Sequence, residues 1–375
     1  MKIGFVLDDS LDKSDGVQQY ILTLGKWYGI QGHEVHYLVG ETKRTDIPRV
    51  HSLSRNVQAH FNQNRMSTPL PASKQPIKTL LESEQFDILH VQMPYSPWLA
   101  GRIIRLAPES TAIIGTFHVI PFSGLEKLAT KALGVALRRS LRRFDAIYSV
   151  SEPARQFAKR AFRVESEVLP NVVSIHNFRS GKPLRQYRDD KLTIVFLGRL
   201  VERKGCLYLL QALELLHRQH ELARVRVLIC GKGPLEPRLK KFVKDNHLKQ
   251  IVQFKGFVSE EDKPHYLASA DIAVFPSTGG ESFGIVLIEA MAVGAGVVLA
   301  GNNIGYRSVM AGRRNQVFNP KNSQEFAKVL KHFINNYRAR SSAKHWQEAH
   351  VEQFDVRVVG HELLTTYSMA IAKRS

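Results

Sequence analysis

The stretch Ile272–Ala300, IAVFPSTGGESFGIVLIEAMAVGAGVVLA, contains the pattern that decides the fold. A short strand-like run, Ile272–Phe275, is followed by a glycine-containing loop, a long apolar helical pattern and a second strand-like run at Val297–Ala300. Strands that alternate with helices predict a parallel sheet with helices on its faces. Two acids, Glu281 and Glu289, lie among these apolar neighbours. A buried carboxylate needs a partner that replaces its lost hydration, so each acid raises the question of its partner.

The same alternation extends over nearly the whole chain and predicts two α/β domains. In the first half we expect strands at Ile3–Leu7, Val35–Val39, Ile88–Val91, Ala112–Thr116, Ala146–Val150 and Glu167–Leu169. In the second half we expect further strands at Thr193–Leu197, Val225–Cys230 and Val252–Phe254. Helical patterns include Gly16–Ile30, Leu125–Phe144, Asn322–Asn336 and Asp355–Lys373. The polar, turn-rich segment Pro170–Lys191 is interpreted as the domain linker, and ligands are expected at the carboxyl ends of the strands.

The composition limits the function classes. The chain has 375 residues, of which 43% are hydrophobic, as in a folded globular protein, and its net charge of +19 indicates an anionic partner. Nucleic acid, acidic lipid and a phosphorylated substrate all fit. Two cysteines, Cys206 and Cys230, are too few for a disulfide framework or a cysteine-based metal site and fit a reducing cytosol. No uncharged apolar run approaches the roughly 18 to 20 residues of a membrane-spanning helix, so we expect a cytosolic protein with at most peripheral membrane contact.

The two acids lie where a ligand could use them. Glu281 precedes a helix expected to begin near Phe283 or Gly284, beside exposed backbone N–H groups that can bind an anion. Residues eight apart on a helix lie within roughly 80° of one another, so Glu281 and Glu289 are expected to reach one elongated ligand. From spacing alone an acid stabilised by the helix dipole, next to an unrelated surface glutamate, fits as well.

Two strand-to-helix turns combine glycine with cations. "FLGRLVERKG" contains Gly198, Arg199 and Lys204, and "ICGKGP" contains Gly231 and Lys232. Glycine allows a ligand to approach the backbone, and the cations suit a phosphate or diphosphate. Each turn alone is a weak signal, because glycine also makes ordinary tight turns. Neither is a P-loop, and the dinucleotide fingerprint G-x-G-x-x-G is missing from the first turns of both domains.

Taken in order, these segments resemble retaining glycosyltransferases of the GT-B fold, and more narrowly glycosyltransferase family 4. The further matching segments are "FKGFVSEEDK", "ESFGIVLIE", the N-terminal "MKIGFVLDDSLDKSDGVQQYILTLGKWYGIQGHEVHYL", "FDILHVQMPYSP" and "GTFHV". The resemblance covers nearly the whole chain and is greatest to phosphatidylinositol mannosyltransferases and related membrane-surface enzymes. It implies two Rossmann-like domains facing a central cleft. The acceptor-side domain would comprise residues 1–172 with a returning C-terminal helix at 355–375, and the nucleotide-sugar domain residues 173–354.

The resemblance also assigns roles to residues. Glu281 would contact hydroxyls of the donor sugar, Glu289 would hold the ribose hydroxyls, and Arg199 and Lys204 would neutralise the diphosphate. His118 matches the active-site histidine that contacts the donor sugar. The other implied donor-binding positions are Gly16, Gly198, Gly231, Lys232, Ser282, Phe283, Gly284, Ile285 and Val286. Fixed cations and helix-end dipoles would stabilise the charge that develops on the leaving diphosphate.

The implied chemistry needs no bound metal, and the chain has no D-x-D triplet to hold one at a diphosphate. For retention of configuration we expect front-face attack, with the leaving phosphate as base for the acceptor hydroxyl and no covalent nucleophile. One departure concerns the interdomain hinge. Many members have Asn-Gly-Val-Asp there, where this chain has "PNVVS", a change that removes no residue assigned to chemistry.

Base recognition rests on "GFVSEEDK", where Val258, Glu260 and Lys263 match the positions that read the base. A carboxylate can accept hydrogen bonds from N1–H and the amino group of guanine, whereas uracil offers one imide N–H. Glu260 therefore favours GDP, and GDP-mannose, over UDP-sugars. A solvated acidic turn that caps the next helix fits these residues equally well.

A basic amphipathic helix is expected within "GLEKLATKALGVALRRSLRRF", with Lys127, Lys131, Arg138 and Arg142 on one face. Such a helix is typical of anionic membrane surfaces, although an ordinary packed helix with a solvated cationic face has the same pattern. A second candidate surface is the stretch Arg55–Lys78, which is interpreted as loop-rich.

We therefore expect a glycosyltransferase that moves mannose from GDP-mannose to a lipid such as phosphatidylinositol at the cytosolic membrane face. Transfer of glucose from UDP-glucose to diacylglycerol is the nearest alternative. A basic nucleic-acid-binding protein is the alternative from another class, but no nucleic-acid module is recognisable. A catalytically silent nucleotide-sugar binder is disfavoured because Glu281, Lys204 and His118 are all present.

Overall fold

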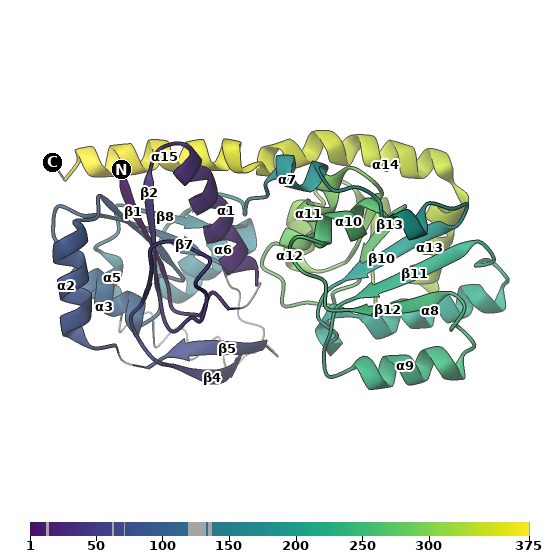
Figure 1. Cartoon of the computed structure of the whole chain (residues 1–375). Coiled ribbons are helices and arrows are strands. Elements are labelled where there is room, and N and C mark those ends of the chain that lie inside the picture. Colours follow the sequence, from purple (N-terminus) through teal and green to yellow (C-terminus); the bar gives the residue numbers. More distant parts are fainter. Residues whose placement is uncertain (13–14, 62–63, 71, 119–132, 134–136, 375) are drawn as a thin grey trace. The chain divides into compact units, whose positions relative to one another are not determined.

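The protein divides into two compact units (Figure 1). The computed structural model describes residues 1–375 except 13–14, 62–63, 71, 119–132, 134–136 and 375, and within 57–69 it describes the backbone alone. Unit 1 comprises Met1–Val172 and Val356–Ser375, and unit 2 comprises Val173–Asp355. Each unit is built on one parallel sheet.

Unit 1 has a seven-stranded sheet in the order β3-β2-β1-β6-β7-β8-β9. Its strands are β1 (Lys2–Leu7), β2 (Glu34–Val39), β3 (Val50–Ser52), β6 (Ile88–Gln92), β7 (Ala112–Phe117), β8 (Ala146–Ser149) and β9 (Glu167–Val168). A separate antiparallel hairpin consists of β4 (Asn56–Phe61) and β5 (Asn64–Pro69). The strand order reverses between β1 and β6, and such a reversal opens a crevice at the carboxyl ends of the strands.

Helices cover both faces of this sheet (Figure 1). They are α1 (Gly16–Ile30), α2 (Lys74–Glu84), α3 (Leu99–Leu106), α5 (Arg138–Leu141), α6 (Glu152–Phe157), the π-helix η1 (Ala158–Phe162) and α15 (Val356–Ala372). Apolar residues of α1 and α15 share one core cluster, and those of α2 and α3 form another on the opposite face.

The C-terminal helix α15 returns to unit 1, as predicted. It buries Val359, Leu363 and Tyr367, which lie four residues apart and so share one helical face. Its Gly360 lies so close to α1 that a Cβ there would be 2.6 Å from the Trp27 ring. The Tyr28 hydroxyl donates a hydrogen bond to the Gly360 carbonyl at 3.3 Å. The end of the chain is therefore part of the first unit's core.

Unit 2 has a six-stranded sheet in the order β12-β11-β10-β13-β14-β15. Its strands are β10 (Leu192–Leu197), β11 (Val225–Cys230), β12 (Val252–Gly256), β13 (Ile272–Phe275), β14 (Val297–Gly301) and β15 (Val317–Phe318). The α-helices are α7 (Ile175–Arg179), α8 (Cys206–Arg218), α9 (Glu236–Asp245), α10 (Lys263–Ala268), α11 (Ile285–Val293), α12 (Ile304–Val309), α13 (Ser323–Asn335) and α14 (Tyr337–His350). Short 3₁₀ turns are η2 (Arg185–Tyr187), η3 (Glu202–Lys204), η4 (Arg314–Gln316) and η5 (Val351–Phe354). This is the strand order of a dinucleotide-binding fold, with its switch point between β10 and β13.

The segment 170–191 is more ordered than the sequence predicts. We expected a linker without helical structure, but α7 and η2 form within it. The Ser174 hydroxyl caps α7 by accepting from the backbone N–H of Asn177. Arg226 of β11 lies over the Tyr187 ring at 4.7 Å and pairs with Asp189 at 2.9 Å. The linker prediction was therefore wrong for this part, because a capping serine and a buried arginine attach it to unit 2.

Two further predictions need correction. The stretch 55–78 is not loop-rich, because it forms the β4–β5 hairpin and the start of α2. Its strands were missed because their sequences, NVQAHF and NRMSTP, contain few β-branched residues. Helix α14 was missed because it is polar over most of its surface and buries only Ala343 and Gln347.

The predicted basic helix is described only in part. Lys127 and Lys131 lie outside the described residues. Arg138 begins α5 and Arg142 follows it, and both side chains are exposed. On the same helix Leu141 is buried in an apolar cluster with Phe162. The described part thus has the expected division into a buried apolar face and an exposed basic one, which fits both interpretations of the pattern.

Candidate functional site

Glu281 lies at the switch point of unit 2, where the loops after β10 and β13 meet. Its Oε1 atom accepts a hydrogen bond from the Ser277 hydroxyl at 2.8 Å. The same oxygen is 2.8 Å from Arg203 Nη1 and 2.8 Å from Lys204 Nζ. All of these contacts use one carboxylate oxygen, so Oε2 takes part in none of them. The partners of this acid are therefore cations of the protein itself, supplied by η3.

The charge state of Glu281 follows from these neighbours. Burial alone would raise the pKa of the Glu281 carboxyl. The positive charges of Lys204 and Arg203 outweigh this effect and leave the pKa below its ordinary value. Glu281 is therefore an ionised carboxylate in a site that also holds two cations, with a net charge of +1 for the three side chains.

Arg203 is the residue of this cluster that the sequence interpretation missed. Its side chain is only 9% exposed, and its carbonyl oxygen accepts from the backbone N–H of Thr278 at 2.8 Å and lies 3.0 Å from the Ser277 hydroxyl. It thus fixes the loop after β13 to η3. The motif "ERKG" shows two adjacent cations, but only the structure shows that both face Glu281. Arg199, the predicted cation, is half-buried just after β10.

Gly198 and Gly231 differ in whether the surrounding structure leaves room for a side chain. Gly231 has φ +146°, and a Cβ there would be 1.9 Å from the Gly198 carbonyl oxygen, so only glycine fits. A Cβ on Gly198 would meet nothing closer than the Phe196 ring at 3.7 Å, an ordinary contact. Lys232, one residue after Gly231, is exposed. Packing within the protein thus explains Gly231 but not Gly198.

Helix α11 begins at Ile285, slightly later than predicted, with Gly284 as its N-cap at φ +121°. Glu281 therefore precedes the helix, and the expected angle between two acids on one helix does not apply. The N–H group of Leu287 donates to the Gly284 carbonyl at 2.9 Å, whereas those of Ile285 and Val286 lie at the start of the helix, where N–H groups have no acceptor within an α-helix. Phe283 is buried, and its ring packs edge-on against Phe354 at 5.6 Å. Ser282 precedes Phe283 in this loop.

Glu289 lies in the second turn of α11 and is buried. Its Oε1 atom is 2.8 Å from Nζ of Lys263, which is also 2.6 Å from Glu260. Burial raises the pKa of the Glu289 carboxyl, and the Lys263 charge opposes this. For Lys263 itself burial lowers the pKa, but Glu289 and Glu260 more than reverse this effect. One buried ammonium group thus bridges two carboxylates.

The predicted base-reading residues are joined to this bridge. Val258 is half-buried and Glu260 exposed in the loop between β12 and α10. The expected turn is also present, since Ser259 and Asp262 hydrogen-bond at its base at 2.8 Å. Lys263, predicted as a base contact, lies buried with its charge shared between Glu260 and Glu289.

The candidate residues of unit 1 are His118 and Gly16. His118 follows β7, is buried, and donates from Nε2 to Gln92 Oε1 at 2.7 Å. The Tyr20 ring packs edge-on against it at 4.9 Å. Burial lowers the pKa of His118 to about 3, so the imidazole is neutral at physiological pH. Gly16 is exposed and begins α1. Gln92 and Tyr20 lie in segments that resemble the family, but nothing in the sequence shows that their side chains contact His118.

Family models match both units. The model described as Glycosyltransferase Family 4 matches residues 14–177, and the model described as Glycosyl transferases group 1 matches residues 183–351. The phosphatidyl-myo-inositol mannosyltransferase of Mycolicibacterium smegmatis is 30% identical over 371 residues, which cover 98% of this chain and 93% of that protein. The mannosyltransferase of the same name from Mycobacterium tuberculosis is 32% identical over 301 residues, which cover 80% and 77%.

Solved structures with the same architecture confirm the fold prediction. The Anabaena protein Alr3699/HepE, solved in complex with UDP-glucose, superposes with a TM-score of 0.76 at 18% identity, covering 98% of this chain and all of that one. A glycosyltransferase from Rickettsia africae gives 0.75 at 18% identity, covering 100% and 99%. Identities this low establish the fold alone. Both units are therefore the Rossmann-like domains of a GT-B fold.

Proposed function

Because this chain belongs to glycosyltransferase family 4 and is a hexosyltransferase, we propose that it transfers mannose, with retention, from GDP-mannose to a phosphatidylinositol-type lipid. The observation that carries the proposal is the Arg203–Lys204–Glu281 cluster at the switch point of unit 2. The names of the mannosyltransferase relatives support this choice of donor sugar and acceptor.

The cluster suits a sugar diphosphate. In the proposal Lys204, Arg199 and Arg203 face the diphosphate, and the first-turn N–H groups of α11 add the positive end of the helix dipole. Gly198 leaves the space that the diphosphate needs beside Lys204. Fixed positive groups stabilise the charge that builds up on the leaving diphosphate, and removing one such group typically reduces turnover by about 100- to 1,000-fold.

The donor sugar is proposed to bind at the other oxygen of Glu281. Oε1 already accepts from Ser277 and faces Arg203 and Lys204, whereas an ionised carboxylate has about four acceptor positions on its two oxygens. Oε2 can therefore accept from sugar hydroxyls without loss of the protein contacts. His118 is proposed to contact the sugar from unit 1 as a neutral imidazole. The acceptor hydroxyl would attack from the front face and pass its proton to the leaving phosphate.

The ribose and base are proposed to bind along the Glu289–Lys263–Glu260 bridge. Glu289 would accept from the ribose hydroxyls, with Val258 beside the base. Glu260 would accept from N1–H and the amino group of guanine, a pattern that uracil lacks. The Lys263 ammonium group, 2.6 Å from Glu260, holds that carboxylate in place for this contact.

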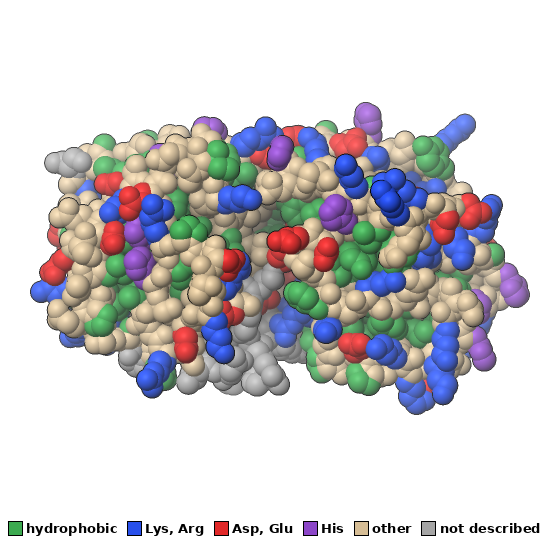
Figure 2. Space-filling view, viewed as in Figure 1, with side chains coloured by type: hydrophobic (Ala, Val, Ile, Leu, Met, Phe, Trp, Pro, Cys, Tyr) green, Lys and Arg blue, Asp and Glu red, His purple; other side chains and the backbone are tan. Residues whose placement is uncertain are grey.

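The lipid acceptor is proposed to be reached from an anionic membrane surface on the cytosolic side. The net charge of +19 supports this, as do the exposed Arg138 and Arg142 beside the buried face of α5. Each basic side chain near an acidic bilayer contributes about 1 kcal/mol. Figure 2 shows Lys and Arg side chains spread over both units on the face in view, with Asp and Glu among them. Among the described residues, no helix has the length and apolar character needed to cross a bilayer.

The test begins with the melting temperature of the purified protein in GDP, UDP, ADP and single-stranded DNA at two salt concentrations. A ligand that binds the folded state raises the melting temperature by mass action. We expect GDP to be selective, and mannose transfer from radiolabelled GDP-mannose to phosphatidylinositol vesicles to follow. A shift with UDP instead would retain the enzyme class and replace mannose by another sugar. A shift with DNA alone, at low salt, would overturn the proposal.

A matched pair of variants tests the cluster. Lys204→Met removes one diphosphate cation and leaves Glu281 paired with Arg203, so the unit should stay folded and lose transfer by at least about 100-fold. Lys240→Met removes an exposed cation that pairs with Glu236 on the surface of α9, and should leave transfer unchanged. Equal turnover in the two variants would contradict the proposed diphosphate site.

A further inference from the structure

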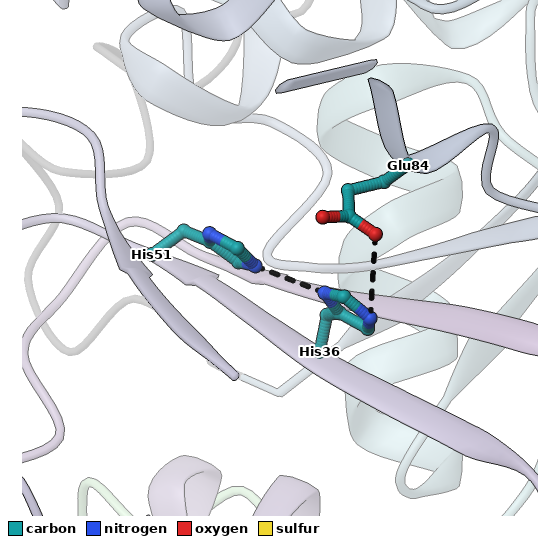
Figure 3. Close-up of side chains that lie close together, drawn as sticks. All are labelled: His36, His51 and Glu84. Atoms are coloured by element: carbon teal, nitrogen blue, oxygen red, sulfur yellow. Dashed lines mark hydrogen bonds and ion pairs between the residues drawn. The ribbon is translucent and has the colours of Figure 1, made fainter. Parts of the chain in front are cut away.

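Three side chains with metal-binding atoms converge in unit 1, at the edge of its sheet. His36 projects from β2, His51 from the edge strand β3, and Glu84 from the last residue of α2 (Figure 3). One nitrogen of each imidazole and one carboxylate oxygen of Glu84 all lie within 4.8 Å of one another. They form the one such group of three among the described residues. This cluster belongs to neither the donor residues of unit 2 nor the His118 site.

The distances are close to those of a metal site. His36 Nδ1 lies 2.9 Å from His51 Nε2, and one ligand atom of each of the three residues lies within 4.8 Å of the other two. Bonds of about 2.0–2.2 Å from a tetrahedral zinc ion to nitrogen and oxygen place neighbouring ligand atoms roughly 3.3 Å apart. Rotations of the half-buried Glu84 and His51 side chains would bring the ligand atoms towards this spacing, since His51 lies on a three-residue edge strand.

The surroundings also fit a metal-binding histidine. Glu34 Oε1 lies 2.7 Å from His36 Nε2, and a carboxylate in this position commonly orients a ligating imidazole. The Phe86 ring packs edge-on against His36 at 5.2 Å and fixes its other side.

Lys2 would compete with a metal ion for Glu84. Its Nζ atom lies 3.0 Å from Glu84 and 3.3 Å from Glu34, so it balances the charge of the two carboxylates. A divalent ion would take over Glu84 and leave Lys2 with Glu34. The ion and the lysine therefore compete for one carboxylate, whereas a purely structural ion-pair network would need Lys2 for its stability.

From this geometry we propose that His36, His51 and Glu84 bind a divalent transition-metal ion of the zinc type. Two imidazoles with one carboxylate suit zinc, whereas magnesium and calcium prefer sites made of oxygen ligands alone. The ion would connect β2, β3 and the end of α2. Without it, β3 is attached to this edge of the sheet as a strand of only three residues. Its role is to stabilise unit 1, away from the reacting groups.

The test uses the full-length protein after treatment with a chelator and dialysis. Isothermal titration with zinc chloride should show one tight site and a raised melting temperature, and magnesium chloride should show neither. Cobalt(II) should give the visible absorption bands of a tetrahedral nitrogen–oxygen site. His51→Ala should weaken zinc binding by at least tenfold and remove the cobalt bands. His345→Ala, which removes an exposed histidine of unit 2, should change neither.

Lys2→Met supplies the result that a structural network does not predict. It removes the competitor and leaves Glu84 for the metal, so zinc should bind severalfold more tightly than in the wild type. Circular dichroism confirms that each variant is folded, and Glu84→Gln replaces His51→Ala if the latter is not. The proposal is overturned if the wild type does not bind zinc, if His51→Ala binds it equally well, or if Lys2→Met binds it more weakly.

Discussion

Replacing Glu281 with glutamine tests whether this carboxylate holds two cations together at the switch point. The exposed fractions of Glu281, Arg203 and Lys204 are 13%, 9% and 19%, and both ion pairs measure 2.8 Å. The amide keeps the shape of the side chain but removes the charge, so the two cations would face each other without a counter-charge. Removing one partner of a buried pair costs about 3–5 kcal/mol. Because Lys204 retains some exposure, we expect the unfolding free energy of unit 2 to fall by about 3 kcal/mol.

GDP should reverse part of this loss. In the proposed site the diphosphate supplies negative charge to Arg203 and Lys204, which lack it in Glu281→Gln. The stabilisation by GDP should therefore be larger in the variant than in the wild type, although sugar transfer is lost. Urea unfolding with and without GDP measures both effects, and hydrogen–deuterium exchange of peptides from β10 and β13 locates them.

Glu202→Gln is the matched control. Glu202 adjoins the same cluster in sequence, but its partner is Arg238 and the two side chains are exposed by 53% and 63%. An exposed pair contributes at most about 1 kcal/mol, so this variant should be close to the wild type. If Glu281→Gln is as stable as Glu202→Gln, and GDP stabilises both equally, Glu281 does not hold these cations and the reasoning fails.

Three further outcomes are expected. Gly198→Ala should keep wild-type stability and weaken GDP binding at least tenfold, whereas Gly231→Ala should lose about 2 kcal/mol or more of stability, as urea unfolding would show. The opposite order would refute the assignment of space at Gly198. Burial lowers the pKa of His118 to about 3 in the folded protein, below its value of about 6.5 in the unfolded chain. As the pH falls below about 6.5, the unfolded chain binds a proton that folded His118 does not. This lowers the free energy of unfolding by about 1.4 kcal/mol per pH unit. His118→Gln should flatten that slope of unfolding free energy, and an unchanged slope would count against a buried neutral imidazole. Lys263→Met should leave Glu289 without its cation and raise its pKa further, so calorimetry should show a greater loss of stability at pH 8 than at pH 5; equal losses would contradict this.

Much of the fold was predictable because its signals are local. Gly16–Ile30 is a helix over the predicted range, and Val225–Cys230 and Ile272–Phe275 are strands as predicted. Parallel strands covered on both faces form continuous apolar runs, as in β13, where all four residues are apolar and buried. Such runs are visible without knowledge of what covers them.

The features that escaped prediction depend on contacts between distant residues. Segment 170–191 looks like a linker because it is polar, yet Arg226, nearly 40 residues away, packs over Tyr187 and fixes it. No local sequence pattern indicates the contact between Arg226 and Tyr187. Helix α14 has a polar sequence, and its Gln347 becomes structural only because the side chain accepts from the backbone N–H of Val298 at 2.8 Å.

The candidate site also contains residues that local motifs indicated and contacts that they did not. The motifs indicated Glu281 and Lys204, because their spacing from strand ends is a sequence property. The sequence did not show that Arg203, in addition to Lys204, pairs with Glu281, since Arg199 and Arg203 both follow β10 within six residues. Only the conformation of η3 directs Arg203 towards this acid. Likewise the sequence did not show that the ammonium group of Lys263, predicted as a base contact, also pairs with Glu289.

The two glutamates of Ile272–Ala300 thus meet the cost of burial in different ways. Glu281 has two cations on one oxygen, so its pKa is lowered and the other oxygen can accept from a ligand. Glu289 shares a single ammonium group with Glu260, and its pKa is raised despite that partner. A ligand hydroxyl that donates to Glu289 would offset part of this unfavourable burial. Binding of the nucleoside is therefore expected to relieve a cost that the unliganded protein carries at Glu289, whereas at Glu281 it adds contacts to an acid that is already satisfied.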